Sequence, residues 1–323
     1  MRSLCNYITN LLFSEKLIDK AAPAVYNGNM KFIIKSNTPD PYVNLAAEEY
    51  LTKRVRRGET ILFLWQNADT VVIGKNQNSR AECDLQKMKR DGVLLSRRLS
   101  GGGTVYHDAG NLCFSFISHA EDHDVPAQLA VIASACAEFG INAKPTGRND
   151  IEADGRKFSG NAFYSIGKNK CHHGTVLISS DTGRLSDYLT VSQTKLEAKG
   201  IKSVRSRVVN LSELVPDITV EAFESALIAA FAPDMTLSMP DQTLFAERTD
   251  FLSSREWLLG SDPEFTDEVK YKTAEGEFTL CLTVKGEIIT DCRVYTDSLD
   301  PTAAERIRAE VMGRKFEEVN SWH

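Results

Sequence analysis

The segment from Arg97 to Asn111 reads RRLSGGGTVYHDAGN and is the most informative part of the sequence. Its three consecutive glycines expose backbone N–H groups and let a ligand approach the main chain closely. The two arginines before them supply guanidinium groups, whose planar fork matches phosphate or carboxylate. A run of N–H groups beside positive charge is typical of an anion-binding site. We therefore predict such a site here; the alternative is a glycine-rich hairpin tip with two solvated arginines.

Apolar runs flank this segment on both sides. Residues 93–95 precede it and residues 112–117 follow it, and both runs have the composition of buried strands. The glycines are therefore expected at a corner between strands, inside a sheet. Helix and strand signals are mixed along the chain without strict βαβ alternation, which indicates an α+β fold with a mixed or mainly antiparallel sheet.

Local signals place the individual elements. Asp40-Pro41 is a helix start, and Gly140 and Gly313 are helix stops. Asp154-Gly155 predicts a type I′ hairpin turn within residues 151–163. Residues 61–65 and 70–73 are expected to form a strand pair joined by a turn. Further strands are expected at residues 32–35, 175–179, 277–284 and 288–295, and helices at residues 126–139, 220–231 and 301–312.

Composition narrows the class of protein. The 323 residues are 42% hydrophobic and 25% charged, with a net charge of −6, which is ordinary for a globular protein and argues against a general nucleic-acid binder. We find no apolar run of about 18 residues and expect no membrane partner. The seven irregularly spaced cysteines fit reduced thiols better than a disulfide framework or a zinc site. We expect a cytoplasmic protein, with an organelle left open.

Two prolines bracket a segment without clear periodicity at residues 233–240. We predict a boundary near residue 240, between a large ligand-binding domain at residues 30–240 and a C-terminal accessory domain at residues 241–323. Residues 1–29 carry both basic and acidic side chains, so they are a poor match to an organelle transit peptide. We treat them as an N-terminal extension of unknown role.

Polar residues that could carry chemistry cluster at predicted strand ends. Lys157 follows the 154–155 turn and points from a strand toward whatever that strand faces; the alternative is an exposed strand lysine. Asp150 could ligate Mg²⁺ together with substrate phosphates, or could be a solvated turn residue. His172 and His173 cannot both face one side of a strand. Cys171 could be a nucleophile, although nothing in the sequence indicates a lowered thiol pKa.

A lysine, an arginine, a run of N–H groups and a Mg²⁺ carboxylate suit one type of reaction. A substrate carboxylate and the α-phosphate of ATP repel one another, and preorganised positive groups offset that repulsion. Such a site makes an acyl-adenylate and holds it away from water.

The residues also match a known family. The chain resembles lipoate–protein ligase of the A type, within the biotin/lipoate ligase superfamily, over about residues 30–310. Any one of the matching motifs is modest evidence, but their order along the chain is highly specific. The motifs are residues 64–67 (LWQN), 71–74 (VVIG), 97–103 (RRLSGGG), 106–108 (YHD), 110–111 (GN), 147–150 (GRND), 157–160 (KFSG), 172–175 (HHGT) and 203–208 (SVRSRV).

The resemblance implies a two-step reaction. Lipoate and Mg-ATP would give lipoyl-AMP and pyrophosphate, and the lipoyl group would then pass to a lysine of an acceptor. The acceptors would be apo lipoyl domains of 2-oxoacid dehydrogenase E2 subunits and of the glycine-cleavage H protein. The fold would be a large catalytic domain, at residues 30–240, with a small accessory domain after it. We expect a monomer.

The resemblance also assigns roles by motif. Lys157 would be catalytic, bridging the lipoate carboxylate and the α-phosphate, and Asp150 would hold the metal. The nucleotide would contact Arg98, Gly103, Thr104, Val105, Tyr106, Asn111, Asn149, Asp150 and Lys157. Lipoate would contact Arg98, Ser100, Gly102, Lys157, Ser159, Gly160 and His173, with Val72, Leu99 and Phe163 as apolar candidates for its tail.

Other readings remain open at this level. An octanoyl- or lipoyltransferase would use a cysteine and no ATP, but no cysteine lies in a matching motif. A biotin ligase would need its own arginine–glycine signature, and a non-catalytic binding subunit would be free to lose Lys157. Five basic residues at positions 195, 199, 202, 205 and 207 are a candidate patch for steering an acidic lipoyl domain, or a solvated loop.

Overall fold

The computed structural model describes residues 30–147, 149–189, 208–259, 267–285 and 287–322. The strands are β1 (Met30–Lys35), β2 (Glu59–Trp65), β3 (Thr70–Ile73), β4 (Leu94–Arg97), β5 (Val105–His107), β6 (Asn111–His119), β7 (Lys144–Thr146), β8 (Asp150–Ala153), β9 (Arg156–Ile166), β10 (Asn169–Leu177), β11 (Met235–Leu237), β12 (Asp267–Thr273), β13 (Gly276–Lys285) and β14 (Ile288–Thr296). The helices are α2 (Pro41–Arg54), α3 (Ser79–Glu82), α4 (Leu85–Asp91), α5 (Val125–Ala137), α6 (Arg184–Tyr188), α9 (Leu211–Leu214), α10 (Val220–Phe231), the 3₁₀ helix η2 (Gln242–Phe245), α11 (Ala246–Ser253), α12 (Arg255–Leu259), α13 (Ala303–Val311) and α14 (Phe316–Asn320).

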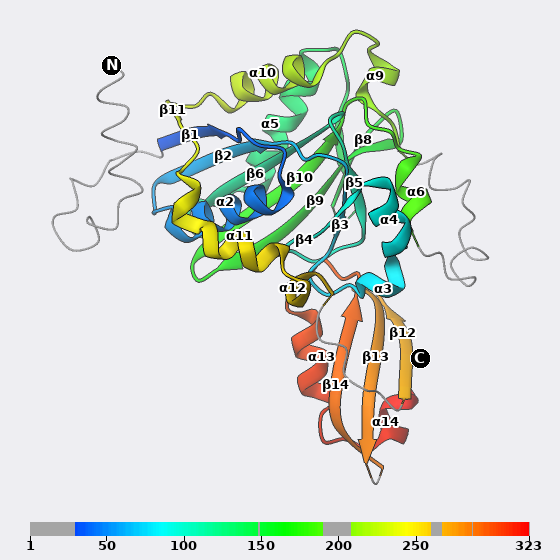
Figure 1. Ribbon diagram of the computed structural model, residues 1–323. Coiled ribbons are helices and arrows are strands. Elements are labelled where there is room, and N and C mark those ends of the chain that lie inside the picture. The colour runs from blue at the N-terminus through cyan, green and yellow to red at the C-terminus, as the bar shows by residue number, and fades with distance from the viewer. Residues whose placement is uncertain (1–29, 148, 190–207, 260–266, 286, 323) are drawn as a thin grey trace, which may run out of the picture.

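An eight-stranded sheet forms the centre of the large part of the chain, in the order β11-β1-β2-β6-β10-β9-β8-β7 (Figure 1). The pairs β11–β1 and β1–β2 are parallel, and the remaining pairs are antiparallel. A second sheet contains β4, β3 and β5 in that order. The predicted α+β class with a mixed sheet is confirmed.

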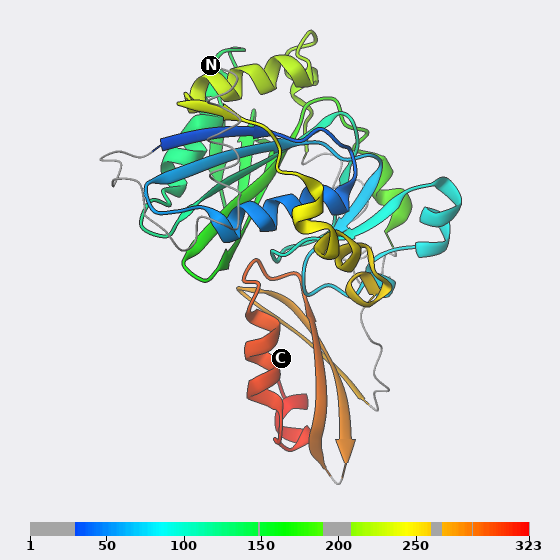
Figure 2. The same cartoon turned by 60° about the vertical axis from the view of Figure 1, so that its left-hand side comes forward.

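Helices cover the two faces of the large sheet (Figures 1 and 2). On one face, Phe114 and Phe116 of β6 pack in a core that includes residues of α5 and α10. On the other face, Cys113 and Ile117 pack in a core built on α2. Because successive side chains of a strand point to opposite faces, β6 contributes to both cores in alternation.

Several local predictions are confirmed. The Asp40 carboxylate accepts hydrogen bonds from the N–H groups of Tyr42 and Val43 and caps α2, with proline at the first helical position. Asp154 and Gly155 have φ angles of 50° and 72°, as a type I′ turn requires. Helix α10 has the predicted bounds.

The strand pair expected at residues 61–65 and 70–73 is wrong. Strand β2 lies between β1 and β6 in the large sheet, whereas β3 belongs to the small sheet. Asn44 on α2 donates from its amide to the Gln66 carbonyl (3.0 Å) and to the Asn67 side-chain oxygen (3.0 Å). These long-range hydrogen bonds hold residues 66–67, which connect β2 to β3, against α2, so the two strands do not form a hairpin.

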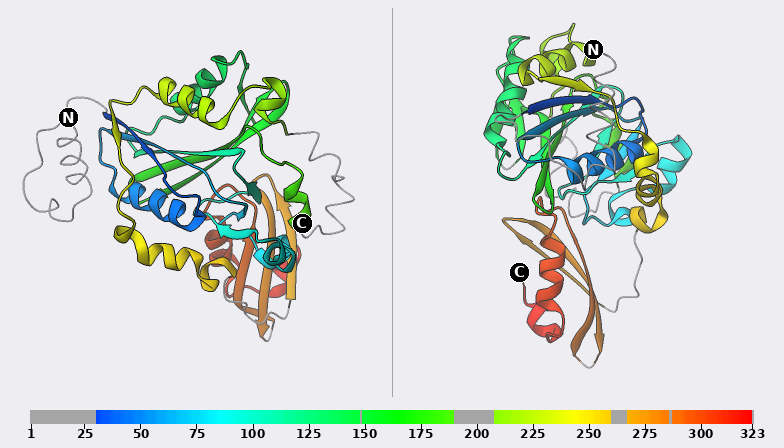
Figure 3. Two further views of the ribbon diagram at one scale, coloured as in Figure 1. Left: turned by 45° about the horizontal axis from the view of Figure 1, so that its top comes forward. Right: turned by 90° about the vertical axis from the view of Figure 1, so that its left-hand side faces the viewer.

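A smaller unit follows at the C-terminal end, where β12, β13 and β14 form a three-stranded sheet with α13 and α14 against it (Figure 3). Strand β12 and helix α14 were not expected from the sequence. The helices α11 and α12 belong to the other side, because their residues Phe251, Leu252 and Trp257 pack in the core built on α2. We propose that the division between the two units lies near residue 260. Among the described residues, no helix combines the length and apolar character that crossing a bilayer needs.

Candidate functional site

A cavity of about 310 Å³ lies where the large sheet meets the small sheet. Its volume falls at the lower end of the range for small-molecule sites, which is about 300–1,000 Å³. The predicted site residues that line it are Arg98, Gly102, Gly103, Thr104, Val105, Tyr106, Asn149, Lys157, Ser159, Gly160 and His173. Apolar side chains, among them Leu45, Trp65 and Val72, make up much of the remaining wall. The fold therefore brings together most of the residues that the motifs singled out.

Three predicted site residues do not line this cavity. Ser100 lies behind the wall, with its hydroxyl 2.6 Å from Nε2 of His173. Asn111 is fully buried and donates from its amide to the Cys113 sulfur (3.2 Å). Asp150 does not line the cavity; its carboxylate contacts the amino group of Lys157, which does. Each of them touches a residue that does line the wall.

Of the three apolar candidates for a tail pocket, the wall contains only Val72. Phe163 stacks on the His172 ring at a centroid distance of 4.6 Å, because its position on β9 turns it to the opposite sheet face. Leu99 packs against the core built on α2. Leu99 and Phe163 are therefore wrong as lining residues.

The Lys157 amino group stands at the edge of the cavity. Its Nζ lies 2.7 Å from Oδ1 of Asp150, and both side chains are about one-third exposed, at 33% and 35%. Asp150 Oδ1 has no well-aligned hydrogen bond, so the contact is an ion pair. A Cβ built on Gly160 would come within 3.0 Å of the lysine Nζ, so glycine at that position leaves the amino group its room. The hairpin of β8 and β9 thus presents one cation at the cavity.

The two arginines of the glycine-rich segment are occupied by the protein itself. Arg97 donates to carbonyls of Gly74, Lys75, Gln77, Trp257 and Leu258. Arg98 donates to carbonyls of Val72, Gly101 and Gly103. Burial lowers the pKa of both guanidiniums to about 10, which still leaves them charged at neutral pH. In this structure both guanidiniums hold the loop in shape. Arg98 also lines the cavity, so its contact with a ligand stays a prediction.

The C-terminal unit contributes to the same loop. The Gly102 N–H donates to the Ser298 carbonyl (2.7 Å), and Leu299 lines the cavity. A Cβ built on Gly101 would lie 2.1 Å from that carbonyl, so only glycine allows the approach. Sequence reasoning missed this contact because no local signal links residues 101–102 to residues 298–299.

Glu48 is a further residue that sequence reasoning missed. It lies fully buried on α2, with its carboxylate oxygens 2.9 and 3.0 Å from Nδ1 of His173 and 2.5 Å from the Ser115 hydroxyl. Burial alone would raise the pKa of Glu48, but the facing His173 and the hydrogen bonds from His173, Ser115 and Tyr164 outweigh it and lower that pKa. No local signal marked it, because α2 also carries Asn44, Glu49, Lys53 and Arg54.

The prediction that the two adjacent histidines face opposite ways is confirmed. His173 points to α2 and the cavity, whereas His172 points to α5, with Nδ1 2.8 Å from the side-chain oxygen of Gln128. The second partner of His172 is Asn161, whose side-chain oxygen lies 2.8 Å from Nε2.

Neither of the two cysteines closest to the site has the character of a nucleophile. Cys113 lines the cavity and Cys171 lies beside Glu48, and both are buried. Burial raises the pKa of both thiols well above the ordinary value, so both are protonated at neutral pH. The idea that Cys171 is a nucleophile is not supported.

Glu48, Cys171 and His173 bring their ligand-type atoms within 4.8 Å of one another. The separations of 2.9 and 3.0 Å between the His173 nitrogen and the Glu48 oxygens are hydrogen-bond distances. We therefore describe the group as a hydrogen-bonded cluster.

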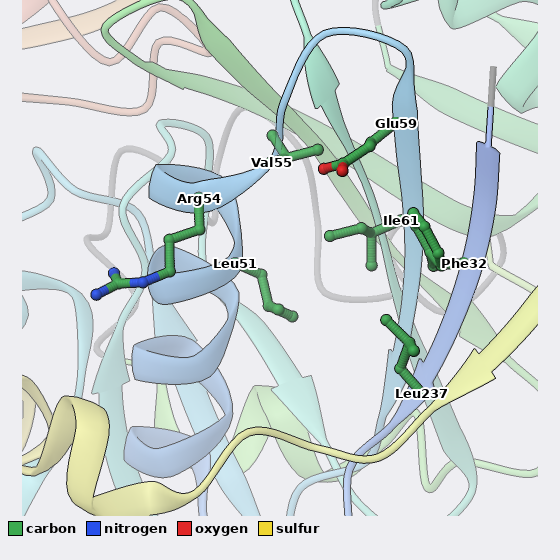
Figure 4. Close-up of a pocket in the computed structure, with 7 residues that line it drawn as sticks. All are labelled: Phe32, Leu51, Arg54, Val55, Glu59, Ile61 and Leu237. Atoms are coloured by element: carbon green, nitrogen blue, oxygen red, sulfur yellow. The ribbon is translucent and has the colours of Figure 1, made fainter. Parts of the chain in front are cut away.

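A second, much smaller hollow of about 10 Å³ lies between α2 and strands β1 and β2 (Figure 4). Its lining is mostly apolar, and the Arg54 side chain extends away from it. This volume corresponds to roughly one water molecule, so the hollow is a packing gap. Arg148 and the basic residues at positions 195, 199, 202, 205 and 207 lie outside the described part of the chain.

Comparison with known proteins agrees with this architecture. Residues 40–232 match the family model of the lipoyl protein ligase A/B catalytic domain, and residues 262–320 match that of the bacterial lipoate protein ligase C-terminus.

Among solved structures, P. falciparum LipL1 in complex with lipoate is 30% identical, with a TM-score of 0.78 over 88% of this chain and 90% of that one. A bipartite lipoate protein ligase from Thermoplasma acidophilum, described with its E2 lipoyl domain, is 28% identical, with a TM-score of 0.65 over 75% of this chain and 100% of that one. A lipoate-protein ligase A bound with ATP is 26% identical, with a TM-score of 0.62 over 72% and 99%. This chain belongs to the lipoate–protein ligase family.

Proposed function

We propose that this protein activates lipoate with ATP to lipoyl-AMP and transfers the lipoyl group to a lysine of an apo lipoyl domain. The observation that carries the proposal is the position of Lys157, whose amino group stands at the edge of a cavity with an apolar wall and a glycine-rich loop. Solved relatives were described with lipoate and with ATP bound, which supports both substrates.

In the first step, a carboxylate oxygen of lipoate attacks the α-phosphorus of ATP and pyrophosphate leaves. Both reactants are anionic, and the Lys157 ammonium offsets the charge that gathers between them. In the second step, the neutral amine of the acceptor lysine attacks the acyl carbon, AMP leaves and the amine loses a proton. The cavity wall of Trp65, Val72 and Leu45 gives the apolar tail a place out of water.

The residues at the Lys157 end fit a magnesium ion. Asp150 offers a carboxylate, one oxygen of which forms the ion pair with Lys157, and the neighbouring Asn149 offers its side-chain oxygen. The Asn149 carbonyl already accepts two hydrogen bonds from Asn161. Oxygen ligands of this kind, one or two carboxylates with substrate phosphates, are what Mg²⁺ takes. When bound, the ion would neutralise phosphate charge; we assign Asp150 to it.

The remaining residues of the cavity wall and the loop are assigned to the two substrates. Gly103, Thr104, Val105 and Tyr106 line the wall and are proposed to contact the nucleotide. Gly102, Ser159, Gly160 and His173 are proposed to contact lipoate. Arg98 and Ser100 are proposed to act through the loop that they hold, since their polar groups are bonded to it or to His173.

An ATP-independent acyltransferase on the same fold is the second candidate, because the matched catalytic model covers both A and B types. That route needs a thiolate. Among the described residues, Cys113 is the cysteine that lines the cavity, and burial raises its pKa. This observation favours the ligase.

The test measures pyrophosphate release with ATP, Mg²⁺ and R-lipoate, and the mass of an added apo lipoyl domain. We expect lipoate-dependent release and a gain of one lipoyl group on the acceptor. Lys157→Ala should melt like wild type and lose about a hundredfold or more in rate, as positioned charge at a reacting centre does; Lys170→Ala, on β10, is the matched control. Transfer of an acyl group from an already modified lipoyl domain to the acceptor, without ATP, would instead establish a transferase.

Acceptor recognition by charge is tested separately. Reversal of Lys195, Lys199 and Lys202 to glutamate should slow transfer to an acidic lipoyl domain and leave pyrophosphate release intact. Transfer that is unchanged at both low and high salt would exclude the basic segment as a docking surface.

A further inference from the structure

His172 is a polar side chain buried among aromatic rings on the sheet face away from the cavity. It is 0% exposed, with Phe163 stacked at 4.6 Å and Phe114 and Phe116 at centroid distances of 5.6 and 5.8 Å. Burial lowers the pKa of this imidazole to about 3, so the ring is neutral. A polar group in such surroundings needs hydrogen-bond partners. The proposed reaction does not account for it.

The hydrogen-bond partners of His172 define its tautomer. Asn161 donates from Nδ2 to the Asn149 carbonyl (3.0 Å), so its side-chain oxygen faces His172. That oxygen can only accept, and the Gln128 side-chain oxygen that lies 2.8 Å from Nδ1 can also only accept. A neutral imidazole has one N–H, so it donates to one of these two oxygens. We assign the proton to Nε2, because the bond from Asn161 Nδ2 to the Asn149 carbonyl fixes the Asn161 oxygen on the ring.

Asn161 joins His172 to the wall of the cavity. Its backbone N–H donates to the Asn149 carbonyl (2.8 Å), and the Asn149 amide donates back to the Asn161 carbonyl (3.0 Å). With the side-chain bond, the Asn149 carbonyl receives two donors from one residue. Asn149, Asn161 and Lys157 all line the cavity, and Asn149 is followed directly by Asp150, the ion-pair partner of Lys157.

Glycine at position 174 leaves space for this arrangement. A Cβ built there would lie 3.0 Å from the Asn161 side-chain oxygen, 2.6 Å from the Gly160 carbonyl and 2.5 Å from the Phe114 ring. Strands β9 and β10 therefore approach each other closely beside Asn161, whose side chain contacts both His172 and Asn149.

We propose that His172 and Asn161 are a positioning pair that sets the Asn149–Asp150 end of the site and thereby tunes the binding of Mg-ATP but not of lipoate. The proposal rests on the proposed function, in which Asn149 and Asp150 face the nucleotide. His172 touches no substrate; it acts by presenting a donor that holds the Asn161 amide in the orientation Asn149 needs. The other histidine, His173, belongs to a separate network with Glu48 and Ser100.

The first test compares three variants around the imidazole. His172→Leu removes the N–H donor that faces Asn161. His172→Gln keeps an N–H donor for Asn161. Gln128→Leu removes only the contact on the α5 side. We expect KM for ATP to rise about tenfold in His172→Leu, with KM for lipoate within about twofold of wild type. His172→Gln should restore most of the ATP value, and Gln128→Leu should leave it near wild type.

Two further measurements are direct binding of an ATP analogue and the coupling between His172 and Asn161. Titration calorimetry with Mg²⁺ and a non-hydrolysable ATP analogue, without lipoate, should show the same order of affinities. Asn161→Ala should weaken ATP binding by a similar factor, and His172→Leu should add nothing in that background, since the pair acts as one unit. Thermal melting of every variant separates loss of binding from loss of folding.

The outcomes are distinguishable. Equal loss toward ATP and lipoate, equal effects of the Gln128 and His172 variants, or additive effects of His172→Leu and Asn161→Ala would overturn the positioning role and leave a structural one. Wild-type protein that binds the ATP analogue but releases no pyrophosphate would refute the proposed function, while the positioning pair would still be judged by the calorimetric affinities. Wild-type protein that does not bind the analogue would refute both.

Discussion

His172 and His173 are neighbours in sequence but lie in opposite environments. His173 faces α2 and the cavity. Its Nδ1 is hydrogen-bonded to the buried carboxylate of Glu48, and its Nε2 is hydrogen-bonded to the Ser100 hydroxyl. His172 faces α5 and lies between two amides and three phenylalanine rings. The difference shows that two identical side chains, adjacent on one strand, obtain different partners because they point to opposite faces of the sheet.

The largest expected effect concerns the charged side of this comparison. Glu48→Ala removes the carboxylate and leaves the buried His173 and Ser115 without their shared partner. Breaking a buried, hydrogen-bonded pair costs about 3–5 kcal/mol of unfolding free energy. Urea unfolding of the variant measures it.

The matched control is Glu121→Ala, whose ion pair with Arg57 is exposed on both sides. An exposed pair contributes about 0–1 kcal/mol, so this variant should unfold close to wild type. Similar losses in the two variants would show that Glu48 does not act as a buried charge partner.

The next effect separates the two faces by pH. The pKa of His172 in the folded protein is lowered to about 3 by burial, below the ordinary value near 6.5. Stability is therefore highest above the unfolded pKa and falls as the pH decreases toward 3, because the unfolded chain takes up the proton first. His107 and His123, with pKa values lowered by burial to about 3 and about 4, contribute in the same direction.

The measurement is urea unfolding of wild type and His172→Gln between pH 6.5 and pH 4.5. We expect a shallower loss of stability in the variant, by up to about 1.4 kcal/mol per pH unit, the limit for one proton. Glu48, whose pKa is lowered, contributes mainly below about pH 4.5 and does not obscure this window. Identical slopes would mean that His172 is not kept neutral by its surroundings.

The smallest effect concerns substrate binding at the charged face. His173→Ala should raise KM for lipoate by about tenfold, equivalent to about 1.4 kcal/mol, with KM for ATP little changed. Together with His172→Leu, which we expect to act on ATP, the two variants should give opposite selectivity. A shift of both KM values in both variants would remove the functional distinction between the two faces.

Much of this protein could be predicted from local sequence. The helix start at Asp40-Pro41, the I′ turn at Asp154-Gly155 and the bounds of α10 follow from capping, turn and periodicity rules that act within a few residues. The motifs also indicated most of the cavity wall, because their order along the chain matches that of one family.

Other features depend on contacts between distant residues. The pairing of β2 with β6 rather than β3, the carbonyls that occupy Arg97 and Arg98, and the contact of Gly102 with Ser298 join segments with no common local signal. Glu48 shows the same limit, since a glutamate on a helix is normally solvated until its tertiary partner is known.

The sequence by itself therefore determined the family, the α+β class, the ends of several elements and the identity of the cation at the cavity. Only the tertiary structure decided which groups remain free for a ligand. The physical reason is that a guanidinium, an imidazole or a carboxylate binds whichever complementary group the packed chain brings within hydrogen-bond distance. For Arg98 that group is a set of carbonyls, and for His173 it is the carboxylate of Glu48.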